Sequence, residues 1–245
     1  MMINVLIGLL IFIAILYIAG PIFIYCVQKL PARVGFEAVD ETSFLSDRSK
    51  KFNALDHELK ALGFEYIGSS RLLDTHNKTY FSLYSNPEHN TAGMLVSMNS
   101  TVDNFTYVEF GQLYADGTML DVSNAPVVSV YPKMDFKIAA RFPKIYSVEK
   151  LYSIFLKLKL SLNNSSPSIA YKRAYGFKKV EAFIARESDE LVNQGYCKSA
   201  VDSEGKRSLT FKGACVFTWK NTFPGKNIYD KLDQAYSRKL LINAE

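Results

Sequence analysis

The longest apolar run of the chain lies at its N-terminus. No side chain before Lys29 carries a charge, and only one asparagine, two glycines and one proline interrupt residues 3–27. A buried helix of a globular domain would show a polar stripe at helical spacing, which this segment lacks. Because about 20 helical residues cross a hydrocarbon core of ~30 Å, the run predicts a transmembrane helix that contacts the lipid bilayer.

Two kinds of cleaved or lipid-modified leader fit the same segment less well. A secretory signal needs a positive start and a small-residue cleavage site. Here the start has no Lys or Arg, and the candidate site Tyr17–Gly20 is followed directly by Pro21. A lipoprotein site at Cys26 would need small residues before it, yet residues 22–25 are large. We therefore expect an uncleaved anchor over residues 1–30.

The charges beside the anchor predict its orientation. The N-terminal flank has no Lys or Arg, whereas Lys29 and Arg33 follow the run. Since positive residues stay cytoplasmic, we expect a single-pass protein of a bacterial inner membrane, with the N-terminus outside and the body in the cytoplasm. Beyond the run only Cys197 and Cys215 remain, which is no disulfide framework and agrees with a reducing compartment.

Residues 31–146 show the pattern of one helix followed by an antiparallel sheet. Ser46 or Asp47 can cap a helix that ends near Leu62, with an apolar stripe at spacings of three and four. Asp116-Gly117 is a turn dipeptide between two strands. The predicted strands are Phe64–Gly68, Thr79–Tyr84, Gly93–Met98, Thr106–Tyr114 and Thr118–Val122. Helix first and strands afterwards indicate an α+β fold.

Residues 147–245 are expected to be mainly helical. Helical spacing and a capping Ser147 favour a helix from Ser147 to Leu162, although Lys159 interrupts its apolar face. Further helices are predicted over Lys178–Asn193 and from Asn227, with a β-hairpin around Asp202–Gly205. The predicted organisation is an anchor over 1–30, an α+β sheet domain over 31–146, and a basic helical region with a hairpin over 147–245.

Charge separates the two parts of the body. Residues 31–146 contain 11 Lys and Arg against 14 Asp and Glu, a net charge of −3. Residues 147–245 contain 17 against 10, a net charge of +7. The second part is therefore the one expected to favour an anionic surface.

Motifs of catalysis are missing from the sequence. It contains no GxSxG, Walker A, GxGxxG, HExxH or paired CxxC pattern. His57 lies on the polar side of a predicted helix, while His76 and His89 flank the strand Thr79–Tyr84 and should be on the order of 20 Å apart. We therefore predict no catalytic, cofactor-binding or metal-binding residue and no cofactor, and the enzyme question stays open.

The stretch from Gly195 to Lys226 has the most distinctive composition. Its aromatic residues alternate with lysines, which suits the headgroup zone of an anionic leaflet. The alternative is that the aromatic side chains belong to the core and the lysines are solvated. The membrane-surface or partner candidates are Lys212, Phe217, Trp219, Lys220, Phe223 and Lys226.

Two resemblances involve this same stretch. The run "GY…RSLTFKG" is similar to the wing of winged-helix DNA-binding proteins. That likeness implies nucleic-acid binding, but the preceding helix Lys178–Asn193 has four acidic against three basic residues, so nucleic acid is an unlikely partner. The acidic sheet region followed by "LTFKGACVFTWKNTFPGK" also resembles an uncharacterised family of membrane-anchored bacterial proteins. That resemblance rests on Lys212, Gly213, Ala214, Thr218, Trp219, Lys220 and Pro224, and it implies a location without an activity.

These patterns predict a cytoplasmic binding or scaffolding body tethered to the membrane. Its partner would be another envelope protein or the anionic lipid surface. The alternatives are a tethered enzyme with a site that the sequence does not display and, less favoured, a winged-helix-like nucleic-acid binder.

Overall fold

The computed structural model describes residues 2–40, 44, 48–72, 78–99, 104–172 and 175–244. The chain forms two compact units, each built from separate stretches of sequence. One unit contains the segment predicted to be an anchor and is called the anchor unit for that expectation; it comprises Met1–Arg33, Ser129–Pro132 and Ile184–Lys231. The sheet unit comprises Val34–Val128, Lys133–Phe183 and Leu232–Glu245. The borders of these units differ from those of the predicted segments 1–30, 31–146 and 147–245. The division into those three domains remains a prediction.

An eight-stranded sheet forms the centre of the sheet unit. Its strand order is β2-β3-β4-β5-β6-β7-β8, with the short β9 paired to β6. The strands are β2 (Phe36–Ala38), β3 (Glu65–Leu72), β4 (Lys78–Asn86), β5 (Thr91–Asn99), β6 (Asn104–Tyr114), β7 (Met119–Ser123), β8 (Lys137–Arg141) and β9 (Ser168–Ile169). The predicted strands correspond to β3–β7, and helices together with this sheet confirm the α+β class.

The sheet buries an apolar face against two helices, α3 (Lys50–Ala61) and α4 (Val148–Leu162). Alternate strand residues such as Tyr84, Leu95 and Phe110 point into this core and are fully buried. The expected stripe of α3 is confirmed, since Phe52, Leu55 and Leu59 are buried. The helix begins after the cap Ser49, because the Ser49 hydroxyl accepts a hydrogen bond from Phe52 N at 3.2 Å. Ser46 and Asp47 lie outside the described residues.

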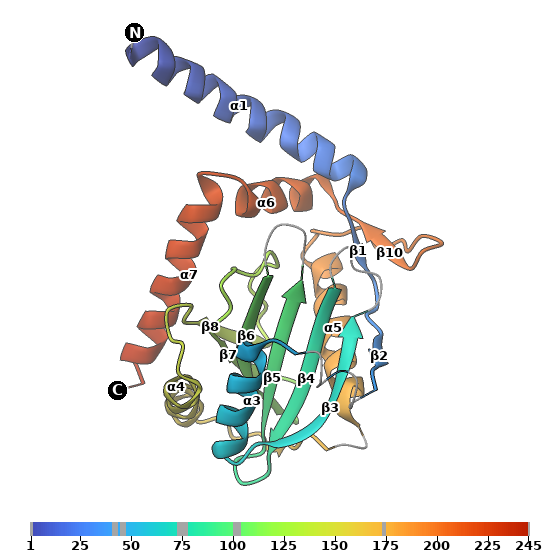
Figure 1. Ribbon diagram of the computed structural model, residues 1–245. Helices are drawn as coiled ribbons and strands as arrows, with labels where there is room; N and C mark the ends of the chain where they lie inside the picture. Colours follow the sequence, from blue (N-terminus) through green and yellow to red (C-terminus); the bar gives the residue numbers. More distant parts are fainter. Residues whose placement is uncertain are drawn as a thin grey trace. The chain divides into compact units, whose positions relative to one another are not determined.

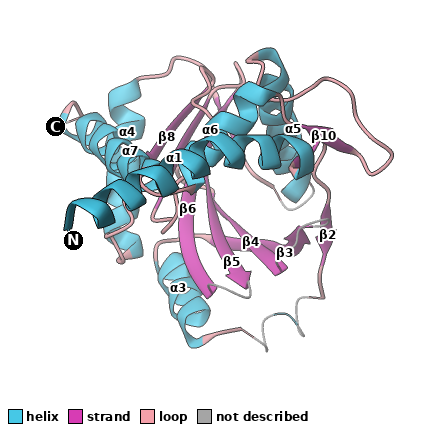
Figure 2. Ribbon diagram, turned by 90° about the horizontal axis from the view of Figure 1, so that it is seen from above, coloured by secondary structure: helices cyan, strands magenta, loops and turns pink. Residues whose placement is uncertain are grey.

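The opposite face of the sheet packs on the start of α5 (Gly176–Asn193). Leu83 and Ala92 of the strands form a second apolar cluster with Tyr171, against which Phe177 and Val180 of α5 pack. Figure 2 shows α3 and α5 on opposite sides of the strands. Several polar side chains of the strands are buried as well, and some pair with one another across neighbouring strands, such as Ser69 of β3 with Ser82 of β4 at 2.6 Å.

The expectation of a wholly antiparallel sheet was wrong at one edge. Strand β8 pairs with β7 in parallel, from Met119 opposite Lys137 to Ser123 opposite Arg141. A parallel pair requires a long crossover, and residues 124–136 supply it without forming a helix. Strand β8 has only five residues, so its pattern of apolar and polar residues is too short to predict the strand or its direction.

The anchor unit contains α1 (Met2–Val27), the strand pair β1 (Lys29–Pro31) with β10 (Lys206–Ser208), and α6 (Phe211–Asn221). It also includes the end of α5 and the start of α7 (Gly225–Ile242). Figure 1 and Figure 2 both show α1 running beside α6. Two segments from opposite ends of the sequence therefore form one helix pair.

The predicted hairpin around Asp202–Gly205 has the expected turn but a different pairing. Gly205 N donates to Asp202 O at 3.0 Å, and Asp202 N donates to Lys206 O at 2.9 Å. The ladder partner of β10, however, is β1, and the stretch before the turn contributes only a bridge from Cys197 to Leu209. An ion pair accompanies this pairing, since Lys29 Nζ of β1 lies 2.7 Å from Asp202 Oδ2 in the turn before β10.

The other predicted helices of the second half are confirmed. Ser147 caps α4 by accepting from Lys150 N at 3.2 Å, and α5 ends before Gly195, whose φ is +74°. The last predicted helix corresponds to α7. In the part of the chain that the structure describes, no helix combines the length and the hydropathy that a membrane crossing requires.

Candidate membrane-facing site

Helix α6 holds most of the predicted surface residues, and its start is set by Thr210. The Thr210 hydroxyl accepts a hydrogen bond from Gly213 N at 3.1 Å and donates to Gly195 O at 2.6 Å. Gly213 is required at this point, because a Cβ there would lie 2.0 Å from Tyr196 O. The helix therefore approaches the segment after α5 at backbone distance.

A second side of α6 packs on the C-terminal half of α1. The Tyr17 hydroxyl of α1 donates to Thr222 O and accepts from Gly225 N, both at 3.0 Å. The Tyr17 and Trp219 rings lie 5.7 Å apart between centroids. A Cβ on Gly20 would lie 2.9 Å from the Thr218 methyl group, so the glycine allows the two helices to approach closely.

The opposite end of α6 contacts the last turns of α1. The rings of Tyr25 and Phe211 lie 6.3 Å apart in an edge-on arrangement, and Lys198 Nζ lies 3.2 Å from the Tyr25 hydroxyl. Phe211 lies beside Tyr25 and Thr222 beside Tyr17, so α6 runs antiparallel to α1. The described ring contacts of the helix pair thus extend from Tyr17 to Tyr25 of α1.

The structure separates the six predicted candidates by exposure. Lys212, Trp219, Phe223 and Lys226 are exposed, with Trp219 39% and Phe223 60% accessible. Phe217 is half-buried and lines a cavity, whereas Lys220 is buried with 5% of its surface accessible. Four of the six can therefore meet a membrane or a partner.

Both lysines of α6 have defined partners. Lys220 Nζ donates to Tyr131 O at 2.6 Å and lies 4.1 Å from the centre of the Tyr229 ring. Lys212 Nζ donates to Gln194 O at 2.7 Å while its side chain stays exposed. Lys220 therefore fixes the loop at Tyr131, and Lys212 retains donors that can reach an anionic group.

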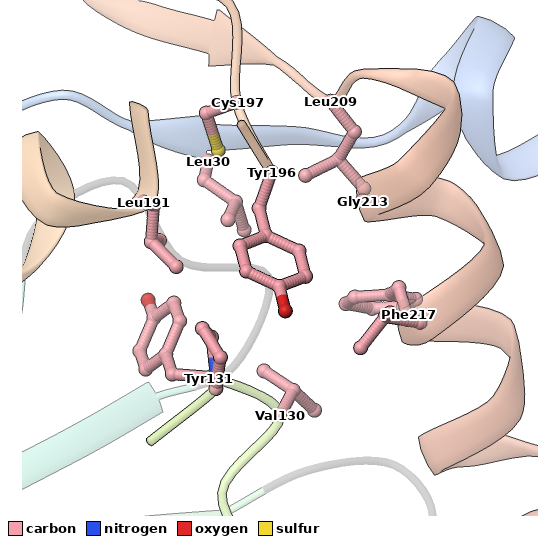
Figure 3. Close-up of a pocket in the computed structure, with 11 residues that line it drawn as sticks. Leu30, Val130, Tyr131, Leu191, Tyr196, Cys197, Leu209, Gly213 and Phe217 are labelled. Atoms are coloured by element: carbon pink, nitrogen blue, oxygen red, sulfur yellow. The ribbon is translucent and has the colours of Figure 1, made fainter. Parts of the chain in front are cut away.

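The cavity beneath α6 is apolar and small (Figure 3). Tyr196 and Phe217 point toward it, and Leu30, Val130 and Leu209 contribute to its wall. Its volume is about 20 Å3, which admits roughly one water molecule. Burial raises the pKa of the Cys197 thiol beside it, so this cysteine is not an activated nucleophile.

The basic residues that follow α1 are paired with carboxylates. Arg33 forms a bidentate ion pair with Asp189, at 2.9 and 3.0 Å, and Arg207 Nη2 reaches the same carboxylate at 2.9 Å. Hydrogen bonds from these two guanidinium groups lower the pKa of Asp189. The hydrogen bond and charge of Asp202 likewise raise the pKa of Lys29. These pairs hold β1, β10 and the end of α5 together directly after α1.

A polar cluster in the sheet unit was missed by the sequence analysis. Lys159 Nζ donates to His89 O at 2.6 Å and to the Gln112 amide oxygen at 3.0 Å. His89 Nδ1 lies 2.9 Å from the Tyr152 hydroxyl. Burial lowers the pKa of Lys159 and raises the pKa of Tyr152 to about 12. The intrusion of Lys159 into an apolar face was the one sequence signal that could have indicated this cluster.

This cluster does not have the features of a catalytic centre. The Lys159 ammonium faces two neutral acceptors, His89 O and the Gln112 amide oxygen, and the amide nitrogen of Gln112 donates to Leu113 O at 2.9 Å. His76 lies outside the described residues, so its distance from His89 is not tested. In the described residues no three His, Cys, Asp or Glu side chains converge on a metal-sized site. The expectation that no metal binds remains a prediction.

The resemblance to a wing covers residues that are partly helical. Lys206–Ser208 form β10, but Thr210 caps a helix that begins at Phe211. Comparisons with known protein families, with curated proteins and with solved structures find no match. The resemblance to membrane-anchored bacterial proteins therefore remains an expectation, and the function has to be argued from the chain itself.

Proposed function

We propose that the protein is a single-pass membrane protein whose body binds a partner at the cytoplasmic surface of a bacterial inner membrane. Helix α1 is the anchor, and no chemical step is assigned to the body. The exposed candidates of α6 and the following turn are the surface through which the body meets lipid or another envelope protein.

The observation that supports the anchor is the outward apolar surface of α1. A monomeric globular protein rarely exposes a contiguous apolar patch of this kind, and burial in lipid would remove it from water. The exposed large apolar side chains are Val5, Ile7, Ile11, Phe12, Ile15, Ile18, Ile22, Phe23 and Val27. The proposal counts the whole sequence of α1, including Met2, Ile3, Leu6, Leu9 and Leu10, whose side chains are not among those described.

The charges near α1 support the orientation with the body in the cytoplasm. Lys29 and Arg33 follow the helix, while the other flank has no Lys or Arg. Their ion pairs with Asp202 and Asp189 belong to the folded anchor unit. Asp202 and Asp189 come long after α1 in the sequence, so the two cations are unpaired while α1 inserts.

A binding role is supported by the surface of α6 together with the small cavity beneath it. Trp219 and Phe223 are exposed aromatic residues, a type enriched at interfaces and in membrane-interface belts. The cavity under the helix has room for about one water molecule. The exposed aromatic residues of α6 therefore support a binding role, and the alternative of a tethered enzyme stays open.

Membrane extraction and reporter fusion test the proposal. We expect the full chain to resist carbonate extraction, and a reporter fused after Glu245 to behave as cytoplasmic. Ile11→Lys together with Ile15→Lys should release the protein, because each charge costs about 2.5–3.5 kcal/mol at the centre of a span. The matched changes to Leu should leave it in the membrane. Carbonate release of the unaltered chain would refute the anchor, and periplasmic reporter activity would refute the orientation.

A further inference from the structure

We propose that the turn joining α6 to α7, with Trp219 and Phe223 on its surface, inserts into the same leaflet that α1 leaves. This inference rests on the proposed anchor and names the second element that enters the lipid. The exposed aromatic side chains Trp219 and Phe223 thus contact lipid, near the boundary between headgroups and acyl chains.

The length of α1 that precedes its described side-chain contacts with α6 and the following turn gives the first reason. These contacts begin at Tyr17, so 15 of the 26 residues of α1 come before them. At 1.5 Å per residue these 15 residues cover about 22 Å, which is less than the ~30 Å of a hydrocarbon core. About five more residues, Tyr17–Pro21, must therefore lie within the hydrocarbon for α1 to cross it.

Those five residues contact the C-terminal end of α6. Tyr17 bonds the backbone at Thr222 and Gly225, and Gly20 meets the Thr218 methyl group. Protein that packs on this part of α1 has to enter the leaflet to the same depth. The start of α6, beside Tyr25, then lies nearer to water, where the exposed Lys212 is found.

The hydrogen bonding of the turn fits a site with little water. A helix end has backbone groups without helical partners, and in lipid these groups must be satisfied by protein. The Tyr17 hydroxyl satisfies Thr222 O and Gly225 N at the same time. Gly225 is held at close range too, since a Cβ there would lie 2.2 Å from Trp219 O.

The side chains that remain exposed around the turn are those that an interface prefers. Trp219, Phe223 and Ile228 are large and exposed, and they belong to the same unit as the exposed Ile18 and Ile22 of α1. Lys226 is exposed in this set, and a lysine can extend its ammonium group to the headgroups while its stem stays among apolar neighbours.

Trp219 is the single tryptophan of the chain, so its fluorescence reports the position of the turn without any label. The full chain is reconstituted in vesicles of phosphatidylcholine and phosphatidylglycerol, with bromine near the headgroup, deep in the acyl chain, or absent. We expect shallow bromine to lower the emission most strongly, because the Trp219 ring lies beside Tyr17, about five helical residues inside the boundary between headgroups and acyl chains. Deep bromine should quench less.

A matched control moves the indole to the other side of the same helix. Trp219→Phe combined with Phe217→Trp places the only tryptophan beside the cavity, two residues away and facing the protein. Its emission should be quenched much less by either bromine. Equal quenching of the two proteins would overturn the inference, since the effect would then be independent of the helix face.

The outcomes separate this inference from the proposed anchor. If the chain floats with the vesicles and resists carbonate but Trp219 is unaffected by bromine, the anchor stands and the insertion of the turn is refuted. If the chain does not float, both are refuted. Strongest quenching by deep bromine would also contradict the inference, because it would indicate a turn buried well beyond the headgroup boundary.

Discussion

Arg141 of β8 and Asp233 of α7 form a buried ion pair, with 2.7 Å between Nε and Oδ2 and 92 residues between them in the sequence. The same guanidinium donates to Ala125 O at 3.1 Å, and Arg141 N donates to the Ser237 hydroxyl at 2.8 Å. These bonds fix the second half of α7 to the edge of the sheet. The part of α7 from Leu232 onward is therefore an integral part of the sheet unit.

Removing Asp233 should destabilise the protein strongly. Asp233→Ala removes a carboxylate that pairs with the buried Arg141 guanidinium, and breaking a buried ion pair typically costs about 3 kcal/mol or more. Asp135→Ala, at an exposed carboxylate of the same unit, should change the free energy of unfolding little. Denaturant unfolding in detergent measures both. A similar small effect of the two changes would show that the pair does not hold α7.

The close approach of α1 and α6 predicts a specific rescue. Gly20→Ala brings a Cβ to 2.9 Å from the Thr218 methyl group and should lower the thermal midpoint by about 2–4 °C for each kcal/mol lost. Thr218→Ser removes that methyl group but keeps the hydroxyl that donates to Ala214 O, so the double variant should recover. Gly8→Ala, near which no described atom lies within 4 Å, is the control and should not destabilise. Additive losses in the double variant would contradict the contact.

The Lys29–Asp202 pair predicts an acid-dependent loss of stability. The hydrogen bond from Lys29, followed by the backbone donors of the turn, lowers the pKa of Asp202 to about 2. A carboxylate whose pKa is lower in the folded state stabilises it above the unfolded value near 4, and this contribution disappears as pH falls toward 2. The free energies of unfolding of wild type and Asp202→Asn should therefore differ at pH 7 and converge near pH 2. Parallel curves over that range would show that the pair contributes nothing.

The polar cluster around Lys159 should be structural. Lys159→Met leaves the fully buried Gln112 without its lysine donor, and such an unsatisfied group costs about 1–3 kcal/mol. Adding Gln112→Leu should restore most of the loss, because both polar partners are then replaced by apolar ones. Lys150→Met, on the exposed side of the same helix, is the control. No rescue in the double variant would point to a role for Lys159 beyond satisfying its acceptors.

Local signals in the sequence predicted much of this fold. Ser147 and the spacing of apolar residues identified α4 against a strand alternative, and the Asp116-Gly117 turn identified the hairpin of β6 and β7. Such features depend on neighbours within a few residues, so the chain displays them directly. The cap of α3 shows the limit, because Ser46, Asp47 and Ser49 are all capable and only packing selects among them.

Long-range pairings could not be predicted in the same way. Nothing in Lys29–Pro31 indicates that it pairs with Lys206–Ser208, and the parallel partner of β8 is set by the crossover before it. The candidate surface residues were found by composition, but only the structure distinguishes the buried Lys220 from the exposed Lys226. Burial depends on which elements meet, and the sequence of α6 alone does not contain that information.

The hydrogen bond from the Tyr17 hydroxyl to Thr222 O joins two residues that are synthesised at very different times. They are 205 residues apart, which at about 5–20 residues per second corresponds to roughly 10–40 s of synthesis. During that interval α1 has no α6 against which to pack. If α1 enters a bilayer during synthesis, as proposed above, that entry precedes its pairing with α6, and the later part of the chain then folds against a helix that is already in lipid.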